Sequence, residues 1–340
     1  MTGIAGAAGD LLTVSDLHVR IHARHGVVRA VDGVSLEVPA GEAVGLVGES
    51  GSGKSMTLRA ILGVLPPEAQ ITAGQVVLDG TDLTQLDTRQ LNNFRGPKIA
   101  MIFQEPMSAL NPVMRVGPQI AEGPLVHLGL TRAQAAERAL DLMRRVGIPD
   151  PERRYRSFPH EFSGGMRQRV MIAMALACDP ALILCDEPTT ALDVTIQDQI
   201  LRLLAKLCRE SGTSLVFVTH DLPVVAQVCH QVAVMYAGRI VERGSVQEIL
   251  TSPQHPYTLG LVGSAPDIDH PRASLTAIPG APPSLVSPPP GCRFHPRCKF
   301  AEQDCQEIEP PLLLLAGGRA TACLHHERCS EVAEMEGAGQ

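Results

Sequence analysis

G-E-S-G-S-G-K-S, residues 48–55, is the stretch of sequence that decides the fold. It follows the apolar run A-V-G-L-V at 43–47 and precedes a helical run that starts at Met56. Glycines admit the backbone dihedrals that let successive N–H groups wrap phosphate oxygens, while Lys54 supplies a cation and the Ser55 hydroxyl can bind Mg²⁺. A strand before and a helix after this motif therefore indicate a phosphate-binding loop (P-loop), whose helix N-terminus also attracts phosphate.

Strand-like patterns surround the P-loop. V-S-L-E-V at 34–38 and Q-V-V-L-D-G at 75–80 predict strands that end in turns. The wholly apolar runs A-L-I-L-C-D at 181–186 and S-L-V-F-V-T-H at 214–220 are typical of strands buried on both faces of a parallel sheet. We therefore expect an α/β fold with a P-loop NTPase-type parallel-sheet core and an antiparallel β subdomain.

The domain organisation follows from two changes in pattern. The chain is helical in period from about residue 105 to residue 160, which we interpret as part of an inserted α-helical subdomain over about 105–178. A proline-rich stretch at 279–290 then precedes five cysteines in the last fifty residues. The pattern predicts a nucleotide-binding domain over 10–262 and a small Cys-rich C-terminal extension over 263–340.

A pair of carboxylates marks a second candidate element. Asp186 and Glu187 end the apolar strand L-I-L-C-D-E at 182–187, at the carboxyl edge of the sheet, where ligands of such folds bind. Asp186 would help to hold Mg²⁺, and Glu187 could orient or deprotonate an attacking water. Alone, these two acids are equally typical of a solvated turn, but the P-loop upstream favours the functional interpretation.

Composition and charge exclude several classes of protein. The 340 residues carry 36 acidic and 29 basic side chains, a net charge of -7 that argues against a nucleic-acid partner. No apolar stretch approaches the roughly 20 residues that span a bilayer, and the first ten residues lack the pattern of a secretory signal. A reducing cytoplasm is therefore the expected compartment, and the four cysteines at 178, 185, 208 and 229 are interpreted as small buried apolar residues.

The stretch F-S-G-G-M-R-Q-R at 162–169 places a serine and two glycines at an expected helix start. Here the chain resembles the ATP-binding cassette (ABC) family. The resemblance implies that this signature closes over ATP held by a second ATPase domain, that Gln104 senses the γ-phosphate, that A-L-D at 191–193 forms a dimer contact, and that His220 is the switch histidine.

The resemblance also assigns the site residue by residue. The expected catalytic residues are Glu187, His220, Gln104 and Lys54, and the expected Mg²⁺ ligands are Ser55, Gln104 and Asp186. The residues that it implies for nucleotide binding are Gly48, Glu49, Ser50, Gly51, Ser52, Gly53, Lys54, Ser55, Met56, Gln104, Ser163, Gly164, Gly165, Asp193 and His220. The family usually stacks adenine on an aromatic side chain before the P-loop, but H-A-R-H-G-V-V-R-A-V-D contains none, which leaves His25 or Val28 for that role.

Three further segments narrow the resemblance to the di- and oligopeptide importer branch: E-P-M-S-A-L-N-P at 105–112, S-P-Q-H-P-Y-T-L at 252–259 and the Cys-rich tail. This branch implies a second homologous ATPase subunit or a self-dimer, two transmembrane permease subunits, an extracytoplasmic peptide-binding protein, and a peripheral location on the cytoplasmic face of the inner membrane. Importers of nickel or other small solutes share parts of the pattern. A soluble, non-transport ABC ATPase is the alternative from another class.

The tail contains Cys292, Cys298, Cys305 and Cys323, with Cys329 as a spare. Disulfides are disfavoured in the cytosol, and the spacing lacks the short C-x₂-C units of common zinc and ferredoxin sites, so the residues alone leave three alternatives: a [4Fe–4S] cluster, zinc, or packing. The resemblance favours the cluster, because some peptide-importer ATPases with similar tails carry one. Cys329 could replace Cys323, and the histidines at 295, 325 and 326 keep a mixed zinc site open.

Overall fold

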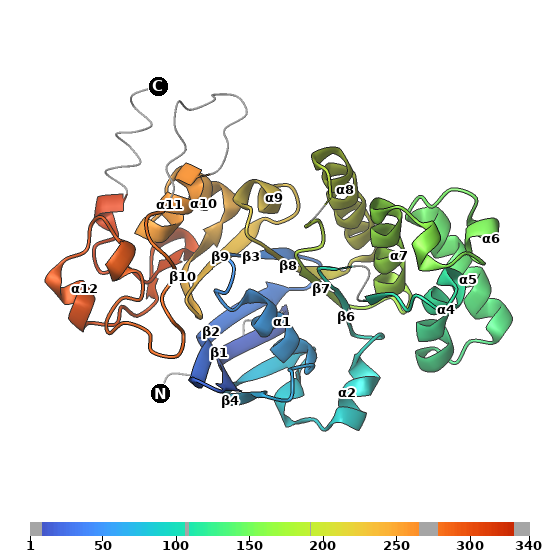
Figure 1. The fold of residues 1–340 in the computed structure, drawn as a ribbon, viewed down its shortest axis with the longest axis horizontal. Helices are drawn as coiled ribbons and strands as arrows, with labels where there is room; N and C mark the ends of the chain where they lie inside the picture. Colours follow the sequence, from blue (N-terminus) through green and yellow to red (C-terminus); the bar gives the residue numbers. More distant parts are fainter. Residues whose placement is uncertain (1–8, 106–108, 191, 265–277, 330–340) are drawn as a thin grey trace. The chain divides into compact units, whose positions relative to one another are not determined.

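The computed structural model describes residues 9–105, 109–190, 192–264 and 278–329. These residues form two compact units, each built from separate parts of the chain (Figure 1). The P-loop unit contains the described residues within 13–37, 43–77 and 218–340, and the helical unit contains those within 1–12, 38–42 and 78–217. The first three residues of P-M-S-A-L-N-P, at 106–108, and Ala191 of A-L-D lie outside the described residues.

The P-loop unit contains the strand that leads into the phosphate-binding motif. Strand β3 (Ala43–Val47) pairs in parallel with β9 (Gln231–Tyr236), and β9 pairs antiparallel with β10 (Arg239–Ser245). The sheet continues into the C-terminal part of the chain, because β12 (Ala320–Thr321) pairs with β10 and β11 (Leu313–Leu314) pairs with β12. Residues 278–329, hereafter the tail, therefore extend the edge of the sheet whose other strands include β3.

A second sheet of this unit contains β1 (Asp10–Ala23), β2 (Gly26–Pro39) and β4 (Ala69–Leu78), in the order β2-β1-β4. A two-residue turn joins β1 to β2, so the two strands run antiparallel. Apolar and polar side chains alternate along β2, where Val34, Leu36 and Val38 are buried. The predicted antiparallel β subdomain is thus present.

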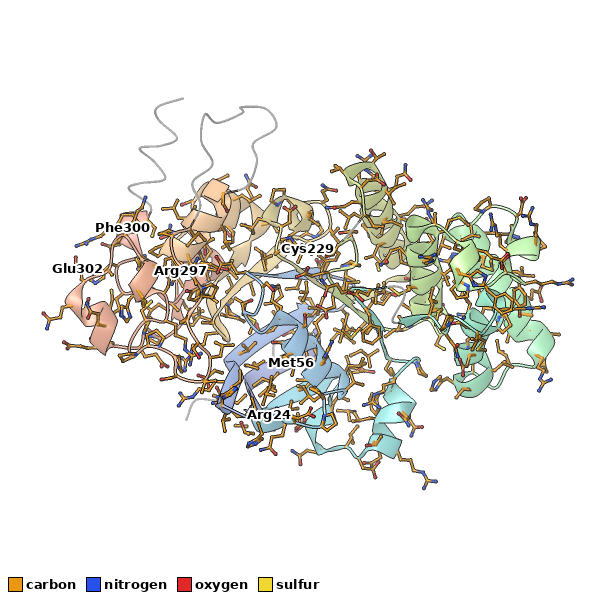
Figure 2. The ribbon with its side chains drawn as sticks, in the orientation of Figure 1. Arg24, Met56, Cys229, Arg297, Phe300 and Glu302 are labelled. Atoms are coloured by element: carbon orange, nitrogen blue, oxygen red, sulfur yellow. The ribbon has the colours of Figure 1, made fainter. Side chains whose placement is uncertain are left out.

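The helices of the P-loop unit are short. They are α1 (Lys54–Leu62), α9 (Leu222–Ala226), α10 (Val246–Thr251), α11 (Pro256–Ser264) and α12 (Gln303–Glu307), with 3₁₀ turns η3 (His295–Arg297) and η4 (Ala316–Gly318). Helix α1 begins at Lys54, within the P-loop motif, and is capped by Gly63, whose positive φ of 70° glycine adopts without strain. Cys229, which is labelled in Figure 2, follows α9. It is 5 % exposed, in agreement with its interpretation as a buried apolar residue.

The helical unit contains parallel strands as well. Its strands are β5 (Thr81–Asp82), β6 (Ile99–Ile102), β7 (Leu182–Asp186) and β8 (Ser214–Thr219), with core order β8-β7-β6. Strands β6 and β7 are parallel, and Ile102 lies opposite Cys185. Every residue of β7 and β8 is buried, which confirms the prediction of strands covered on both faces.

Helices dominate the rest of this unit. They are α2 (Thr88–Phe94), α4 (Val116–His127), α5 (Arg132–Arg145), α6 (Pro151–Arg154), α7 (Gly164–Leu176) and α8 (Val194–Ser211), with 3₁₀ turns η1 (Leu83–Gln85) and η2 (Pro159–Glu161). Helices α4, α5 and α7 pack against one another, and α6 packs on α5 (Figure 1). Helix α5 begins at a capping box between Thr131 and Gln134 and stops before Gly147, as its sequence pattern predicts.

Candidate nucleotide and cysteine sites

The P-loop is a tight turn that only glycine can form at two positions. A Cβ atom at Gly48 would lie 2.0 Å from the backbone O of Met235, and one at Gly53 would lie 2.2 Å from the backbone O of Ala30. Gly53 also has a φ of 110°, which side-chain-bearing residues rarely adopt. The loop thus presents its backbone at the N-terminus of α1, as phosphate binding requires.

Lys54 folds back over this loop. Its Nζ donates hydrogen bonds to the backbone O of Gly48 at 2.6 Å and of Glu49 at 2.9 Å, and the side chain is 4 % exposed. The buried Ser52 Oγ has no hydrogen-bond partner among the described residues, as expected of a group that faces a ligand. The Ser52 carbonyl accepts the Gly238 N–H at 2.8 Å, which fixes the middle of the loop to the end of β9.

The helical unit brings two of the predicted catalytic residues together. Asp186 ends β7 and is 3 % exposed, and Glu187 follows it with a φ of 46°. Gln104 follows β6, the parallel neighbour of β7, so both lie beyond adjacent carboxyl ends. Gln104 Nε2 lies 3.5 Å from Glu187 Oε2, which also accepts a 3.1 Å hydrogen bond from Thr190 Oγ1. Parallel pairing of β6 and β7 explains this contact.

The signature residues occupy a helix start. Ser163 is the N-cap of α7 and accepts the Met166 N–H, with Gly164 and Gly165 in the first turn. Asp193 caps α8 in the same way, through the Ile196 N–H at 3.0 Å. A Cβ at Gly165 would lie 2.8 Å from Ile196, so the glycine permits the close approach of α7 and α8. His220 is exposed at the end of β8.

The candidate adenine contacts lie in the β1–β2 turn and at the start of β2, and the proline-rich stretch lies beside the P-loop. His25 is exposed, and Val28 is half-buried. Pro282, Pro283 and Leu285 line a pocket together with residues 49–52 of the P-loop. The sequence interpretation of this stretch as a domain boundary missed that contact, since nothing in a proline-rich composition indicates what the segment packs on.

The tail gathers the predicted cysteines around one cavity. Cys292, Cys298, Cys305 and Cys323 line it, with the side chains of His295 and His325 beside them. Burial raises the pKa of Cys292 to about 11 and of Cys323 to about 12. The thiols are therefore protonated near neutral pH, and a metal that binds them must displace protons.

Cys329 and a group of possible metal ligands lie in the same part of the tail as the cavity, and both concern the choice between a cluster and zinc. Cys329 is fully buried and is not among the residues that line the cavity. Asp304, Cys305 and His325 have ligand atoms within 4.8 Å of one another, and His325 Nε2 lies 3.0 Å from Asp304. The group of Asp304, Cys305 and His325 could hold a single ion such as zinc, and the four cysteines share the lining of one cavity.

Comparison with known proteins identifies the family. A family model described as ABC transporter matches residues 31–190, and one described as oligopeptide/dipeptide transporter, C-terminal region, matches residues 241–305. The probable peptide ABC transporter ATP-binding protein y4tR of Sinorhizobium fredii is 52 % identical over 92 % of this chain and 94 % of its own length. The chain belongs to the ABC transporter family.

Other relatives of this ABC protein agree. The oligopeptide transport ATP-binding protein OppD of Salmonella typhimurium is 47 % identical over 93 % of this chain and 94 % of its own length. The solved dimer of the ATP-binding cassette MJ0796 with ADP and Pi is 29 % identical, with a TM-score of 0.63 over 69 % of this chain and 98 % of the cassette. The predicted α/β fold with a P-loop core is confirmed, and the chain is an ABC ATPase.

One structural finding concerns the membrane. Among the described residues, no helix has both the length and the apolar content that a membrane span requires.

Proposed function

We propose that this ABC ATPase couples ATP binding and hydrolysis to the import of di- or oligopeptides. The observation that carries the proposal is the match of residues 241–305 to the C-terminal region of oligopeptide/dipeptide transporters, in a chain 47 % identical to an oligopeptide transport ATP-binding protein. The alternative is an ABC importer of nickel or another small solute, which the uptake experiment distinguishes from a peptide importer.

The partners follow from the same proposal. The chain pairs with a second ATPase subunit, a homologue or a copy of itself, at the cytoplasmic face of the inner membrane. Two permease subunits form the peptide path, and an extracytoplasmic binding protein delivers the peptide. The signature supports a dimer, because an N-cap serine and two glycines at the start of α7 leave backbone N–H groups that can face the phosphate of the opposite subunit's nucleotide.

Each nucleotide-site residue has a proposed role. Lys54 and the amides of residues 48–56 neutralise phosphate charge, and Ser55, Gln104 and Asp186 hold Mg²⁺. Glu187 acts as general base on water, while Gln104 and His220 align the γ-phosphoryl group. The contact between Gln104 and Glu187 supports their joint action on one water. His25 or Val28 contacts adenine.

The signature residues Ser163, Gly164, Gly165 and Asp193 act on the nucleotide of the partner ATPase. ATP binding closes the dimer around two nucleotides, and hydrolysis reopens it. The movement reaches the permeases through the helical subdomain, which begins after Gln104, and so switches access to the peptide path.

We propose that Cys292, Cys298, Cys305 and Cys323 hold a [4Fe–4S] cluster. The donor set supports this assignment, since four thiols line one cavity and soft thiolates are the usual ligands of such clusters. A bound cluster would supply a covalent link among distant parts of the tail and a redox-active centre. Zinc is the alternative, and iron, sulfide and zinc analysis of anaerobically purified protein distinguishes the two.

The test of the transport proposal uses Glu187→Gln in the assembled complex with its permeases. We expect steady ATP hydrolysis to fall by roughly 10²-fold or more, because the general base is lost while ATP binding remains. Glu210→Gln is the matched control, because Glu210 is an exposed acid of α8 whose ion-pair partner is Lys206, at 3.8 Å. Unchanged ATP hydrolysis in Glu187→Gln would show that Glu187 is not the general base.

Uptake separates the possible substrates. In vesicles that contain the complex, we expect peptide-loaded binding protein to stimulate both ATP hydrolysis and peptide accumulation. The Glu187→Gln complex should show neither effect. Stimulation by nickel instead of peptide would reassign the substrate. Failure to co-purify with any membrane subunit would indicate a soluble ABC ATPase.

A further inference from the structure

The tail contacts the P-loop through one arginine. Arg297 donates two parallel hydrogen bonds to the carboxylate of Glu49, from Nη1 to Oε2 at 2.8 Å and from Nη2 to Oε1 at 3.0 Å. The Arg297 side chain is 6 % exposed and that of Glu49 is 24 % exposed. A bidentate, largely buried pair of this kind fixes position more strongly than a surface ion pair does.

Arg297 is itself held in place by the tail and by an aromatic cluster. Its Nε donates to the backbone O of Pro279 at 2.8 Å, and its guanidinium lies over the rings of Tyr236 and Phe294. Figure 2 shows Arg297 on the side of the tail near β9 and β10, with Phe300 and Glu302 farther out. The arginine therefore reaches from the tail toward the strand next to β3.

Glu49 is a well-connected residue of the P-loop. Its backbone N–H donates to Tyr257 Oη at 2.7 Å, and its carbonyl accepts the Lys54 Nζ at 2.9 Å. With the Arg297 pair, Glu49 is thus anchored through its N–H, its carbonyl and its carboxylate. A shift of Glu49 would move the carbonyl that holds Lys54, the cation proposed for the terminal phosphates.

The same arginine adjoins the cysteine cavity. Cys298, the next residue, lines that cavity, as does Phe294, whose ring centre lies 5.2 Å from that of Tyr236. A continuous set of packed groups therefore runs from the cavity through Phe294 and Arg297 to Glu49. Arg297 is not one of the nucleotide-binding residues proposed above.

We infer that Arg297 is a positioning residue for the P-loop, which it acts on through the Glu49 carboxylate, and that nucleotide binding and the order of the tail are coupled through this pair. The inference rests on the assignment of residues 48–55 as the ATP-binding loop. Because coupling between two sites is reciprocal, ATP stabilises the tail by the same factor by which an ordered tail favours ATP.

The first experiment measures the affinity of the purified full chain for a fluorescent ATP analogue. We expect Arg297→Gln to weaken binding about tenfold, in line with the loss of a charge-assisted bidentate pair, and Arg297→Lys to restore part of it. In a double-mutant cycle, Arg297→Gln should add less than about twofold to the effect of Glu49→Gln. Additive effects of the two changes would refute action through Glu49.

Arg319→Gln is the matched control. Arg319 is another tail arginine, and it pairs with Glu242 at 3.4 Å and with the Ser252 carbonyl, away from residues 48–55. Its loss should lower thermal stability without changing ATP affinity more than about twofold, because its partners lie outside the P-loop. An equal loss of affinity in Arg319→Gln would show that Arg297 acts only through general stability.

The second experiment measures hydrogen exchange of the backbone at 292–305 with and without ATP. We expect ATP to slow exchange in the wild type and to have little effect in Arg297→Gln, because the pair transmits the stabilisation. Circular dichroism verifies that each variant is folded, and Arg297→Lys provides the test if the glutamine variant is not. Wild-type affinity and wild-type protection in a folded Arg297 variant would overturn the inference.

A further variant tests the assignment of residues 48–55 as the ATP-binding loop separately from the coupling. Lys54→Ala should abolish binding of the analogue in every background. A wild-type chain that does not bind it would refute the ATP-binding assignment, whereas normal binding with an inert Arg297 refutes only the coupling.

Discussion

The P-loop and the cysteine cavity of the tail are the two candidate ligand sites proposed above, and their residues are arranged in opposite ways. Residues 48–55 are contiguous and form one turn whose shape is set by two crowded glycines. The cavity in the tail draws its four cysteines from positions between 292 and 323, joined mostly by short turns. The comparison teaches that a contiguous motif predicts its own geometry, whereas a dispersed site depends on what holds its segments together.

The tail is held by contacts to the rest of the P-loop unit. Strand β12 pairs with β10, and the buried Arg293 forms ion pairs and hydrogen bonds with Asp32 of β2 and with the Ala237 carbonyl. Short helices and few strands bury little apolar surface of their own, so such contacts must supply much of the stability of the tail.

The largest expected effect is loss of the metal that we propose for the tail. Cys323→Ser removes a thiol that lines the cavity, so we expect the iron or zinc content to fall to near zero. Cys329→Ser is the control, since this cysteine is buried but does not line the cavity, and the metal content of this variant should stay at the wild-type level. Metal analysis of both purified variants tests this prediction. Loss of metal in Cys329→Ser but not in Cys323→Ser would indicate that Cys329 is the fourth ligand.

The sequence predicted the P-loop, the strands β7 and β8 and the helix α5 because each depends on neighbours within a few residues. Gly48 and Gly53 are required by local crowding, and the cap of α5 lies three residues from its partner Gln134. The contact of Gln104 with Glu187 depends on parallel pairing of two strands, and only the family resemblance indicated it.

The remaining contacts could not be predicted from the sequence in this way. Arg297 and Glu49 are 248 positions apart, and neither residue belongs to a pattern that marks it for the other. The same holds for Tyr257 and for the prolines beside the P-loop, which one sequence cannot place. Cys323 and Cys329 look equivalent in sequence, and only the fold shows which of them lines the cavity.

A smaller effect is expected where β2 meets the tail. Asp32 is 3 % exposed and pairs with Arg20 and Arg239 as well as with Arg293. Although burial opposes ionisation, the hydrogen bond from Arg20 and the charge of Arg293 hold the pKa of Asp32 well below its usual range. Asp32→Asn leaves the buried Arg293 without its carboxylate partner. This loss should lower the unfolding free energy by about 3–5 kcal/mol.

Denaturant unfolding of Asp32→Asn measures this cost. Asp198→Asn is the control, because Asp198 pairs with Arg202 on the surface of α8, where the loss of an ion pair costs at most about 1 kcal/mol. Because Asp32 has a lowered pKa, its contribution is present near neutral pH and is lost only in strong acid, as the carboxylate becomes protonated. Equal stabilities of the two variants would show that the tail does not depend on this ion pair.

The smallest expected effect concerns pH, and it acts where the tail and the P-loop share a support. His255 lines the cysteine cavity, and its Nδ1 accepts the N–H of Tyr257, whose hydroxyl accepts the Glu49 N–H. Burial lowers the pKa of His255 to about 3 from the usual 6.5. The unfolded chain therefore binds a proton that the folded chain excludes between these values, and stability must fall as the pH is lowered from 6.5.

His255→Asn tests this effect, because an asparagine carbonyl can accept the N–H two residues on without titrating. Between pH 6.5 and 5, the wild type should lose about 1.6 kcal/mol more than the variant, because the slope approaches about 1.4 kcal/mol per pH unit only below the unfolded pKa. Glu242, which accepts the His255 N–H and whose pKa burial raises to about 6, acts in the opposite direction but is present in both proteins. Thermal unfolding at the two pH values supplies the comparison, and parallel losses in both proteins would mean that His255 is protonated in the folded state.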